Sequence, residues 1–439
     1  MSPENDRRNV LKYIRKSAGI LSLLLLFNSI GLTACGQIVA ETGYVSMDAA
    51  DAEKDIENIP ATDAPVSALT VDVLVDRQGY AAEGEKQAVI KGRQPAETFR
   101  LVNKETGETV YEGAIKQKEY YNEELEQYIG IADFTDYTGE GVFYLECGNV
   151  GRSLPFSLKK DHYQELLTVL CEDVRDRCQD RSITEDEIIS LLAACEWYPQ
   201  VFADDNGNEI PDVLEYIADW LEQTNSNTDT PEPENMCYVA AMAKFSYLYQ
   251  KYDVQYAAKW LQQASTIYTG LETNSDSDAE KFLALTELYR ASGLLTYRNQ
   301  ILEYQDFFED NTGYLEEETA YLYGTMTYLS ARQPVDIKLC TLFMESIRDR
   351  GEELAKQTRN MMDVVTNVDY GTEELLKRAE ELSCANYVLF SYQYTEILKD
   401  FLHYLMGCNR DLKSYYPGEE NAAEYLLLIA QQVSLTDKQ

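Results

Sequence analysis

The sequence predicts a two-domain protein in which an all-β domain precedes an all-α domain. From Val71 onward, short runs rich in β-branched and aromatic residues are separated by turn residues, which is the pattern of short strands. After Leu158 the apolar residues recur at spacings of three and four, which is the period of an amphipathic helix. At 439 residues the chain is long enough for more than one hydrophobic core.

The β-rich part spans residues 70–159 and predicts a β-sandwich. Roughly seven short strands fit into this length, and that density of strands and turns is typical of two packed antiparallel sheets. Thr106 and Gly107 separate two of the runs and are expected to form the turn of a hairpin. The region is therefore interpreted as a single sandwich domain.

The helical part spans residues 160–435. Phe245, Leu248 and Tyr249 illustrate the spacing that repeats through about a dozen segments joined by short loops. Many helices of similar length predict either a closed ring of helical hairpins or an open solenoid. The periodicity leaves both arrangements open.

The N-terminal segment, residues 1–35, has the pattern of a bacterial lipoprotein signal. A basic stretch precedes an apolar run from Ile20 to Phe27, which is a secretion signal rather than a spanning helix. The sequence Leu-Thr-Ala-Cys that ends at Cys35 resembles a lipobox, in which the signal is cut before a cysteine that then carries the lipid. We therefore expect lipidation at Cys35 and anchoring to the outer face of a bacterial membrane. The alternative is an ordinary cleaved signal with a coincidental cysteine.

Residues 36–69 predict an acidic, disordered tether. They contain few large apolar side chains and many Ala, Asp and Glu residues, with prolines at Pro60 and Pro65. Such a composition does not bury enough apolar surface to fold. The segment would lift the folded domains away from the membrane.

The net charge excludes one class of partner. The chain carries 76 acidic and 38 basic residues, for a formal net charge of -38. Phosphate backbones would be repelled, so nucleic acid is not expected as a partner. The 33 tyrosines suit both sugar stacking and helix packing, so they favour neither function.

Cysteines and histidines give no sign of a metal centre. Beyond Cys35 the chain has no Cys-x-x-Cys pair, and we expect buried free thiols rather than a disulfide framework. The two histidines, His162 and His403, lie far apart in helical stretches, and no serine or cysteine nucleophile has a credible partner. No organic cofactor is expected.

Four stretches of the β-rich part carry a family resemblance: Asp72–Tyr80, Phe99–Val102, Tyr111–Gly113 and Gly151–Phe156. Together they resemble the N-terminal immunoglobulin-like domain of bacterial family-9 glycoside hydrolases, the cellulases. The resemblance implies an immunoglobulin-like sandwich and a role in polysaccharide catabolism.

The helical part continues this resemblance. In LLAACEWYPQVFADDNGNEIPDVLEYIADWL a helix ends at Tyr-x-Pro and a loop carries Asn-Gly-x-x-Pro-Asp, as in the family. Further matches follow in the family's order, at Tyr252–Ala257, Leu288–Gly293, Cys384–Tyr387 and Tyr404–Asn409. The resemblance spans residues 70–432 and implies an (α/α)6 barrel behind the sandwich.

The catalytic motifs of the family are where this sequence differs. Family-9 enzymes invert: an Asp of an Asp-Ala-Gly-Asp motif activates water, and a Glu near the C-terminus protonates the leaving oxygen. Here the helix ending near Cys178 leads almost directly to the helix at Ile188, and no Asp-Ala-Gly-Asp occurs. Ser182 with Glu185, or Thr184 with Glu187, forms a capping-box pattern, so these acidic residues are expected to start a helix. Weak candidates for a rewired base are Asp176 and Asp180.

The C-terminal acid is also doubtful. The sequence that begins at Asn409 matches the family at first and then runs directly into Ala422, so a segment is missing. Glu419 and Glu420 are weak candidates for the acid, and the alternative is that they precede a terminal helix.

One loop has the composition of a weak calcium site. Asp204, Asp205, Asn206 and Asn208 offer oxygen ligands around Gly207, but the spacing and terminal Glu of an EF-hand are absent. A structural turn before a helix that starts near Pro211 is the preferred interpretation.

The sequence supports three functional hypotheses. The first is a surface-anchored pseudoenzyme that binds β-glucan or a related polysaccharide, or acts as a scaffold. The second is an active inverting glycosidase that uses rewired carboxylates. The third is a helical framework whose cleft is filled and which binds no sugar. We prefer the first, because both catalytic segments are shortened.

Overall fold

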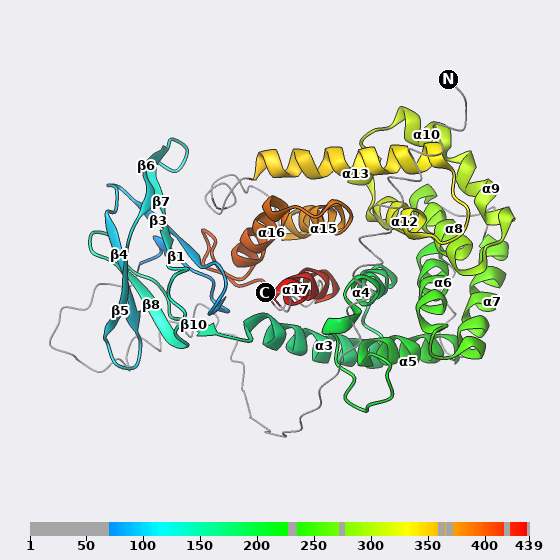
Figure 1. Ribbon diagram of the computed structural model, residues 1–439, viewed down its shortest axis with the longest axis horizontal. Coiled ribbons are helices and arrows are strands. Elements are labelled where there is room, and N and C mark those ends of the chain that lie inside the picture. The colour runs from blue at the N-terminus through cyan, green and yellow to red at the C-terminus, as the bar shows by residue number, and fades with distance from the viewer. Residues whose placement is uncertain are drawn as a thin grey trace.

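The computed structural model shows a β-sandwich joined to a helical domain (Figure 1). It describes residues 70–226, 235–271, 277–358, 365, 372–416 and 422–436. The predicted signal and tether lie outside this part of the chain. Within it, no helix is both long enough and apolar enough to cross a membrane.

Two sheets form the sandwich. The first has the order β1-β3-β7-β6 and is antiparallel throughout. Its strands are β1 (Val73–Leu74), β3 (Gln87–Gly92), β6 (Lys116–Asn122) and β7 (Gln127–Asp133). The second has the order β2-β10-β8-β4-β5, with β9 added beside β8 and a parallel pairing between β2 and β10. Its strands are β2 (Tyr80–Ala81), β4 (Thr98–Asn103), β5 (Thr109–Ala114), β8 (Gly141–Cys147), β9 (Gly151–Arg152) and β10 (Phe156–Lys159).

The predicted hairpin joins β4 to β5. Gly107 has φ +70°, and its N–H donates to the carbonyl of Asn103 over 2.9 Å. The Asn103 side chain accepts from the N–H groups of Glu105 and Thr106, which closes the turn. A glycine suits the left-handed position because it has no Cβ to clash with the backbone. The sequence-based assignment of this turn is confirmed.

Six helices of the described chain form a closed inner ring. They contact one another in the order α4, α6, α8, α12, α15 and α17, and α17 returns to contact α4. The periodicity left a ring or a solenoid open, and this closing contact identifies the ring. The inner helices are α4 (Glu185–Trp197), α6 (Met236–Tyr249), α8 (Asp278–Ser292), α12 (Thr319–Ser330), α15 (Thr372–Leu389) and α17 (Ala422–Thr436).

A second layer of helices surrounds the ring. In Figure 1, α13 crosses one side of the domain and α3 and α5 cross the opposite side. The long outer helices are α3 (His162–Asp180), α5 (Asp212–Ser226), α7 (Val254–Leu271), α9 (Leu295–Glu303), α13 (Ile337–Gln357) and α16 (Tyr392–Leu405). Short helices are η2 (Pro199–Val201), α10 (Gln305–Asp310) and α11 (Tyr314–Glu317).

Burial patterns explain which helices lie inside. In α6 every residue from Met236 to Ser246 is buried, because the helix has neighbours on all sides. In the outer helix α7 the buried residues form one stripe, at Ala257, Trp260, Ala264 and Tyr268. An amphipathic stripe fits an outer helix and a uniformly apolar one fits an inner helix.

The two domains meet through a shared polar and apolar interface. Leu74, Val89 and Ile129 of the sandwich form one cluster with Cys408 of the segment after α16. The backbone N–H of Arg77 donates to the carbonyl of Met406 over 2.9 Å. The sandwich is therefore fixed to the segment that leads toward α17.

The eight cysteines after Cys35 are free thiols, as expected from their spacing. Six are buried, and burial raises the pKa of several, to about 12 for Cys147 and Cys178. A thiol with such a pKa stays protonated and packs as a small apolar side chain.

Candidate functional site

The connection between α3 and α4 is four residues long and ends in a helix cap. Thr184 is the N-cap: its hydroxyl accepts from the N–H of Glu187 over 3.3 Å, and the Glu187 carboxylate accepts from the N–H of Thr184 over 3.0 Å. The prediction that acidic residues here start a helix is confirmed, with Thr184 and Glu187 forming the capping box.

Glu187 also joins the two helices. It is buried, and Arg177 near the end of α3 reaches its two carboxylate oxygens over 2.5 and 2.7 Å. A two-pronged guanidinium contact of this kind fixes orientation as well as distance. The ion pair therefore holds the α3–α4 connection closed.

Deeper in the ring, Glu380 of α15 is buried between neighbouring helices. Ser190 of α4 donates to its carboxyl group over 3.1 Å, and the hydroxyl of Tyr323 of α12 also donates to it. Burial raises the pKa of Glu380 to about 7 despite these hydrogen bonds.

Glu424 lies in the first turn of α17. Burial, and then the charge of Glu380, raise the pKa of Glu424 to about 8. One of its carboxyl oxygens is buried without a hydrogen-bond partner among the described residues. A carboxyl group with this pKa holds its proton at neutral pH, which is what a general acid requires.

Further carboxylates gather where α4, α6 and α8 begin. Asp186 is exposed and accepts a hydrogen bond from the thiol of Cys237 over 3.2 Å. Burial, followed by the charges of Asp186 and Glu318, raises the pKa of Glu280. We call this end of the ring, with Asp186, Glu280, Glu318 and Glu424, the acidic mouth.

A buried ion-pair network lies toward the other end of the same helices. Arg290 of α8 contacts Glu196 over 2.5 Å and Glu287 over 2.6 Å, and Lys244 of α6 contacts the same two glutamates. Burial acts to raise the pKa of Glu196, but the two cations outweigh it and lower the pKa to about 2. Each carboxylate oxygen of Glu196 and Glu287 faces one of the two cations, so these glutamates are held in ion pairs rather than available as reactive groups.

Comparison with known proteins supports the division into a β-sandwich and a helical domain. Residues 70–152 match the family of cellulase N-terminal ig-like domains. A metagenome-derived glycoside hydrolase family 9 endoglucanase superposes with a TM-score of 0.65 at 19% identity, covering 79% of this chain and 85% of that chain. A glycoside hydrolase family 9 protein from Bacteroides ovatus gives 0.62 at 13% identity, covering 84% and 100%. AaCel9A in complex with cellobiose-like isofagomine gives 0.60 at 16% identity, covering 78% and 84%. Among curated protein sequences none matches.

This chain has the fold of glycoside hydrolase family 9. The expected immunoglobulin-like sandwich followed by an (α/α)6 barrel is confirmed by these matches and by the closed ring of inner helices. At the identities found, the likeness establishes the family-9 fold, and the chemistry has to come from the site itself.

The candidate base residues lie on the outside of this family-9 fold. Asp176 is exposed at the end of the outer helix α3 and pairs with its neighbour Arg175 over 3.0 Å. Asp180 is exposed and accepts from the N–H of Ser182 over 2.9 Å. Both contacts are with residues close by in the sequence, and the catalytic role of Asp176 and Asp180 stays a prediction. Glu419, Glu420 and Cys35 lie outside the described residues.

Sequence reasoning missed Glu380 and Glu424. Glu424 precedes the strongly apolar run of residues 425–430, which was the available signal, whereas Glu380 lies near the charged residues Lys377 and Arg378 and gave none. Ser190 and Tyr323, which donate to Glu380, are far away in the sequence, so periodicity alone did not distinguish these buried glutamates from solvated ones.

The loop considered for calcium is closed by its own hydrogen bonds. The Asp204 carboxylate accepts from the N–H groups of Gly207, Asn208 and Glu209 over 2.8 to 3.1 Å. The side-chain amides of Asn206 and Asn208 donate to Glu215 of α5. These bonds account for the loop as a turn before α5. In the described part of the chain, no group of three or more His, Cys, Asp or Glu is arranged to hold a metal ion.

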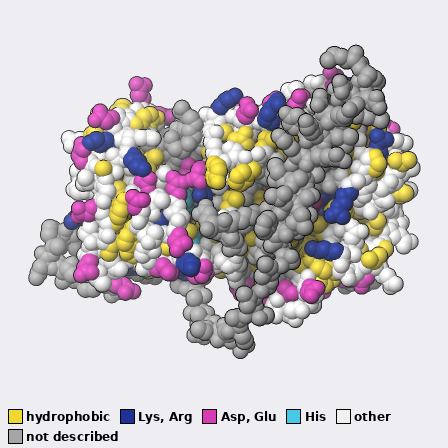
Figure 2. All heavy atoms as spheres, viewed as in Figure 1, with side chains coloured by type: hydrophobic (Ala, Val, Ile, Leu, Met, Phe, Trp, Pro, Cys, Tyr) yellow, Lys and Arg dark blue, Asp and Glu magenta, His cyan; other side chains and the backbone are white. Residues whose placement is uncertain are grey.

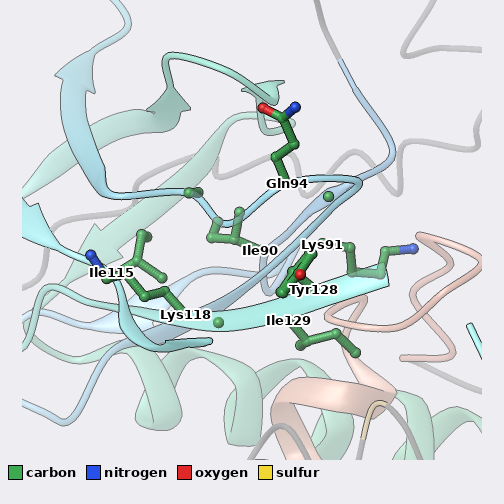
Figure 3. Close-up of a pocket in the computed structure, with 10 residues that line it drawn as sticks. Ile90, Lys91, Gln94, Ile115, Lys118, Tyr128 and Ile129 are labelled. Atoms are coloured by element: carbon green, nitrogen blue, oxygen red, sulfur yellow. The ribbon is translucent and has the colours of Figure 1, made fainter. Parts of the chain in front are cut away.

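A small hollow lies on the sandwich (Figure 3). Gln94, Lys118 and Tyr128 are among its lining residues, and it encloses no room for even a water molecule. Ligand pockets for small molecules usually measure roughly 300 to 1,000 Å³, so this hollow is not a sugar-binding pocket.

Proposed function

We propose that this protein is a membrane-anchored relative of the family-9 hydrolases that binds a neutral β-glucan without hydrolysing it. The fold supports a polysaccharide ligand, since matching structures are endoglucanases and one holds a cellobiose-like isofagomine. The predicted lipobox at Cys35 supports attachment to the outer face of a bacterial membrane.

One observation supports the proposed loss of hydrolytic activity. In the family that the sequence resembles, the catalytic base belongs to the connection before the second helix. Here that connection consists of residues 181–184 and is closed by the Thr184 cap and the Arg177–Glu187 ion pair. An inverting reaction needs a base that holds water on the face opposite the acid. Glu187, tied to a guanidinium and to the cap, is occupied in another role.

One observation favours the active glycosidase as a second candidate. Glu424 lies at the start of the last inner helix and keeps a proton at neutral pH, as a general acid does. The exposed carboxylate of Asp186 at the acidic mouth is then the candidate base. Removing either carboxyl group from a working pair would lower the rate by orders of magnitude.

A single comparison separates these functions. The full chain, purified in a detergent that carries no sugar, is incubated at high concentration with soluble and insoluble β-glucans, and reducing ends are counted. Its migration is also followed in native gels that contain the soluble glucans. We expect retarded migration and no release of reducing ends.

Two outcomes would overturn the proposal. Release that disappears in Glu424→Gln would establish the hydrolase. Neither release nor retardation with any glucan would leave the third hypothesis, a barrel that binds no sugar. The exposed variant Glu345→Gln on α13 serves as the matched control for Glu424→Gln.

A further inference from the structure

The turn between α15 and α16 exposes two aromatic side chains. Phe390 is 55% exposed and Tyr392 is 77% exposed, which is the highest value among the large hydrophobic side chains that the structure describes. Their ring centroids lie 5.5 Å apart at an interplanar angle of 67°. In Figure 2, hydrophobic side chains gather over the region of α15 and α16. Exposed aromatic pairs of this kind commonly mark binding sites.

The backbone presents these rings in a fixed and unfavourable conformation. Phe390 has φ +41°, a left-handed conformation that side chains with a Cβ rarely adopt. Its N–H donates to the carbonyl of Asn386 over 2.9 Å. The buried side chain of Asn386 accepts from the N–H of Ser391 over 2.9 Å and donates to Thr395 over 3.1 Å. Strain that the surroundings hold in place is a feature of functional sites.

The segment that forms the turn carries no charged side chain. Residues 382–395 include no Asp, Glu, Lys or Arg, in a chain where such residues make up 26%. The turn therefore offers ring faces, the hydroxyl groups of Ser391 and Tyr392, and the amide of Gln393. Without a cation in this segment, a phosphate or carboxylate ligand finds no partner of opposite charge. Aromatic faces with neutral hydrogen-bonding groups complement an uncharged, polyhydroxylated ligand.

The turn lies at the end of the ring opposite the acidic mouth. Ser190 meets Glu380 partway along α4 and α15, and Trp197 stacks on Tyr387 near the ends of the same helices, at 5.0 Å between centroids. The two helices therefore run in the same direction. Because α4 begins at the mouth, the C-terminal end of α15 lies away from it.

We propose that Phe390 and Tyr392 form a carbohydrate contact away from the acidic mouth, on which a pyranose unit of a neutral β-glucan stacks. This inference rests on the proposed function and deepens it by naming a surface. The C–H face of the sugar ring packs on Tyr392, while Phe390 holds the tyrosine ring at its edge. No covalent step is involved.

The test is affinity electrophoresis of the full chain in gels with soluble neutral β-glucan. The double variant Phe390→Ala/Tyr392→Ala is compared with Leu294→Ala/Leu295→Ala, which removes exposed apolar side chains from the α8–α9 turn. Neither variant changes the charge, so mobility without glucan is the same. We expect the aromatic variant to lose affinity roughly tenfold and the control to bind as the original chain does.

A further variant separates a sugar contact from a general apolar contact. Tyr392→Leu keeps an apolar side chain but removes the flat ring. Affinity for the glucan should fall if a sugar stacks on the ring, and should stay the same if the contact is only apolar. Affinity that is unchanged in both Phe390→Ala/Tyr392→Ala and Tyr392→Leu overturns this contact and leaves the proposed function standing. If the original chain shows no retardation, the proposed function fails together with it. Equal melting temperatures exclude unfolding as the cause of any loss.

Discussion

Nδ1 of His403 on α16 lies 2.7 Å from Oδ2 of Asp76 in the sandwich, so this buried polar contact helps to join the two domains. The other oxygen of Asp76 accepts from the N–H groups of Gln78 and Gly79 over 2.7 and 3.1 Å. Asp76 is fully buried, and its burial raises the pKa of the carboxyl group. One side chain thus fixes both a turn of the sandwich and the packing of α16.

Replacing Asp76 by alanine is expected to lower the free energy of unfolding by about 3 kcal/mol, because His403 and two N–H groups lose their partner inside the protein. Urea unfolding followed by circular dichroism measures the effect. Asp349→Ala is the control, since Asp349 is exposed and pairs with its neighbour Arg348. Equal stability of the two variants would show that the interdomain contact contributes little.

The fold was largely predictable because local patterns determine it. Alternating strands and the Gly107 turn followed from residues that are neighbours in the sequence. The choice between a ring and a solenoid did not follow from neighbouring residues. It depends on the contact between α4 and α17, which lie far apart in the sequence. The two histidines gave no hint either: His162 and His403 are far apart in the sequence, yet burial and then the charge of His403 lower the pKa of His162 to about 3.

The cap of α4 offers a sharp test of the α3–α4 connection. Thr184→Ala should cost about 1 kcal/mol of stability, because the N–H of Glu187 loses its acceptor. Ser182→Ala should cost roughly 0.5 kcal/mol or less, since Ser182 is exposed and lies before the cap. Chemical denaturation of both variants distinguishes them. A larger loss for Ser182→Ala would mean that the helix begins with the other capping pair.

The candidate site was less predictable than the fold. Asp176, Asp180, Glu419 and Glu420 were chosen from their places in a family pattern. The carboxyl groups with the most unusual environments, Glu380 and Glu424, acquire them from helices that pack around them. Perturbed pKa values arise from burial and charge in three dimensions, which a single sequence does not display.

The raised pKa of Glu424 predicts a pH-dependent stability. In the unfolded chain this carboxyl group has its ordinary pKa of 4.5, while in the folded chain its pKa is about 8. The folded state therefore binds more protons between these values, and its stability falls as the pH rises through this window. Glu424→Gln stays neutral, so its advantage over the original chain should grow between pH 5 and pH 8, on the order of 2 kcal/mol. Unfolding curves at both pH values measure it, and a constant difference would contradict the assignment.

Lipidation of Cys35 is checked in a bacterial expression host by labelling with an alkyne fatty acid. We expect label in the original chain and none in Cys35→Ala, which should also leave the membrane fraction. Cys147→Ala is the control, because Cys147 is a buried free thiol of the sandwich. Absence of label from the original chain would instead fit an ordinary secretion signal, and equal labelling of Cys35→Ala would place the lipid on another residue.

Strain at Phe390 is measurable apart from any ligand. Phe390→Gly and Phe390→Ala both remove the exposed ring, but only glycine adopts φ +41° without a clash between Cβ and the backbone. Phe390→Gly should therefore be more stable than Phe390→Ala by about 1 kcal/mol, although glycine also gains entropy in the unfolded chain. Thermal and urea unfolding of the two variants give the difference. If alanine is the more stable, the turn is relaxed, and strain no longer supports a binding role for the two rings.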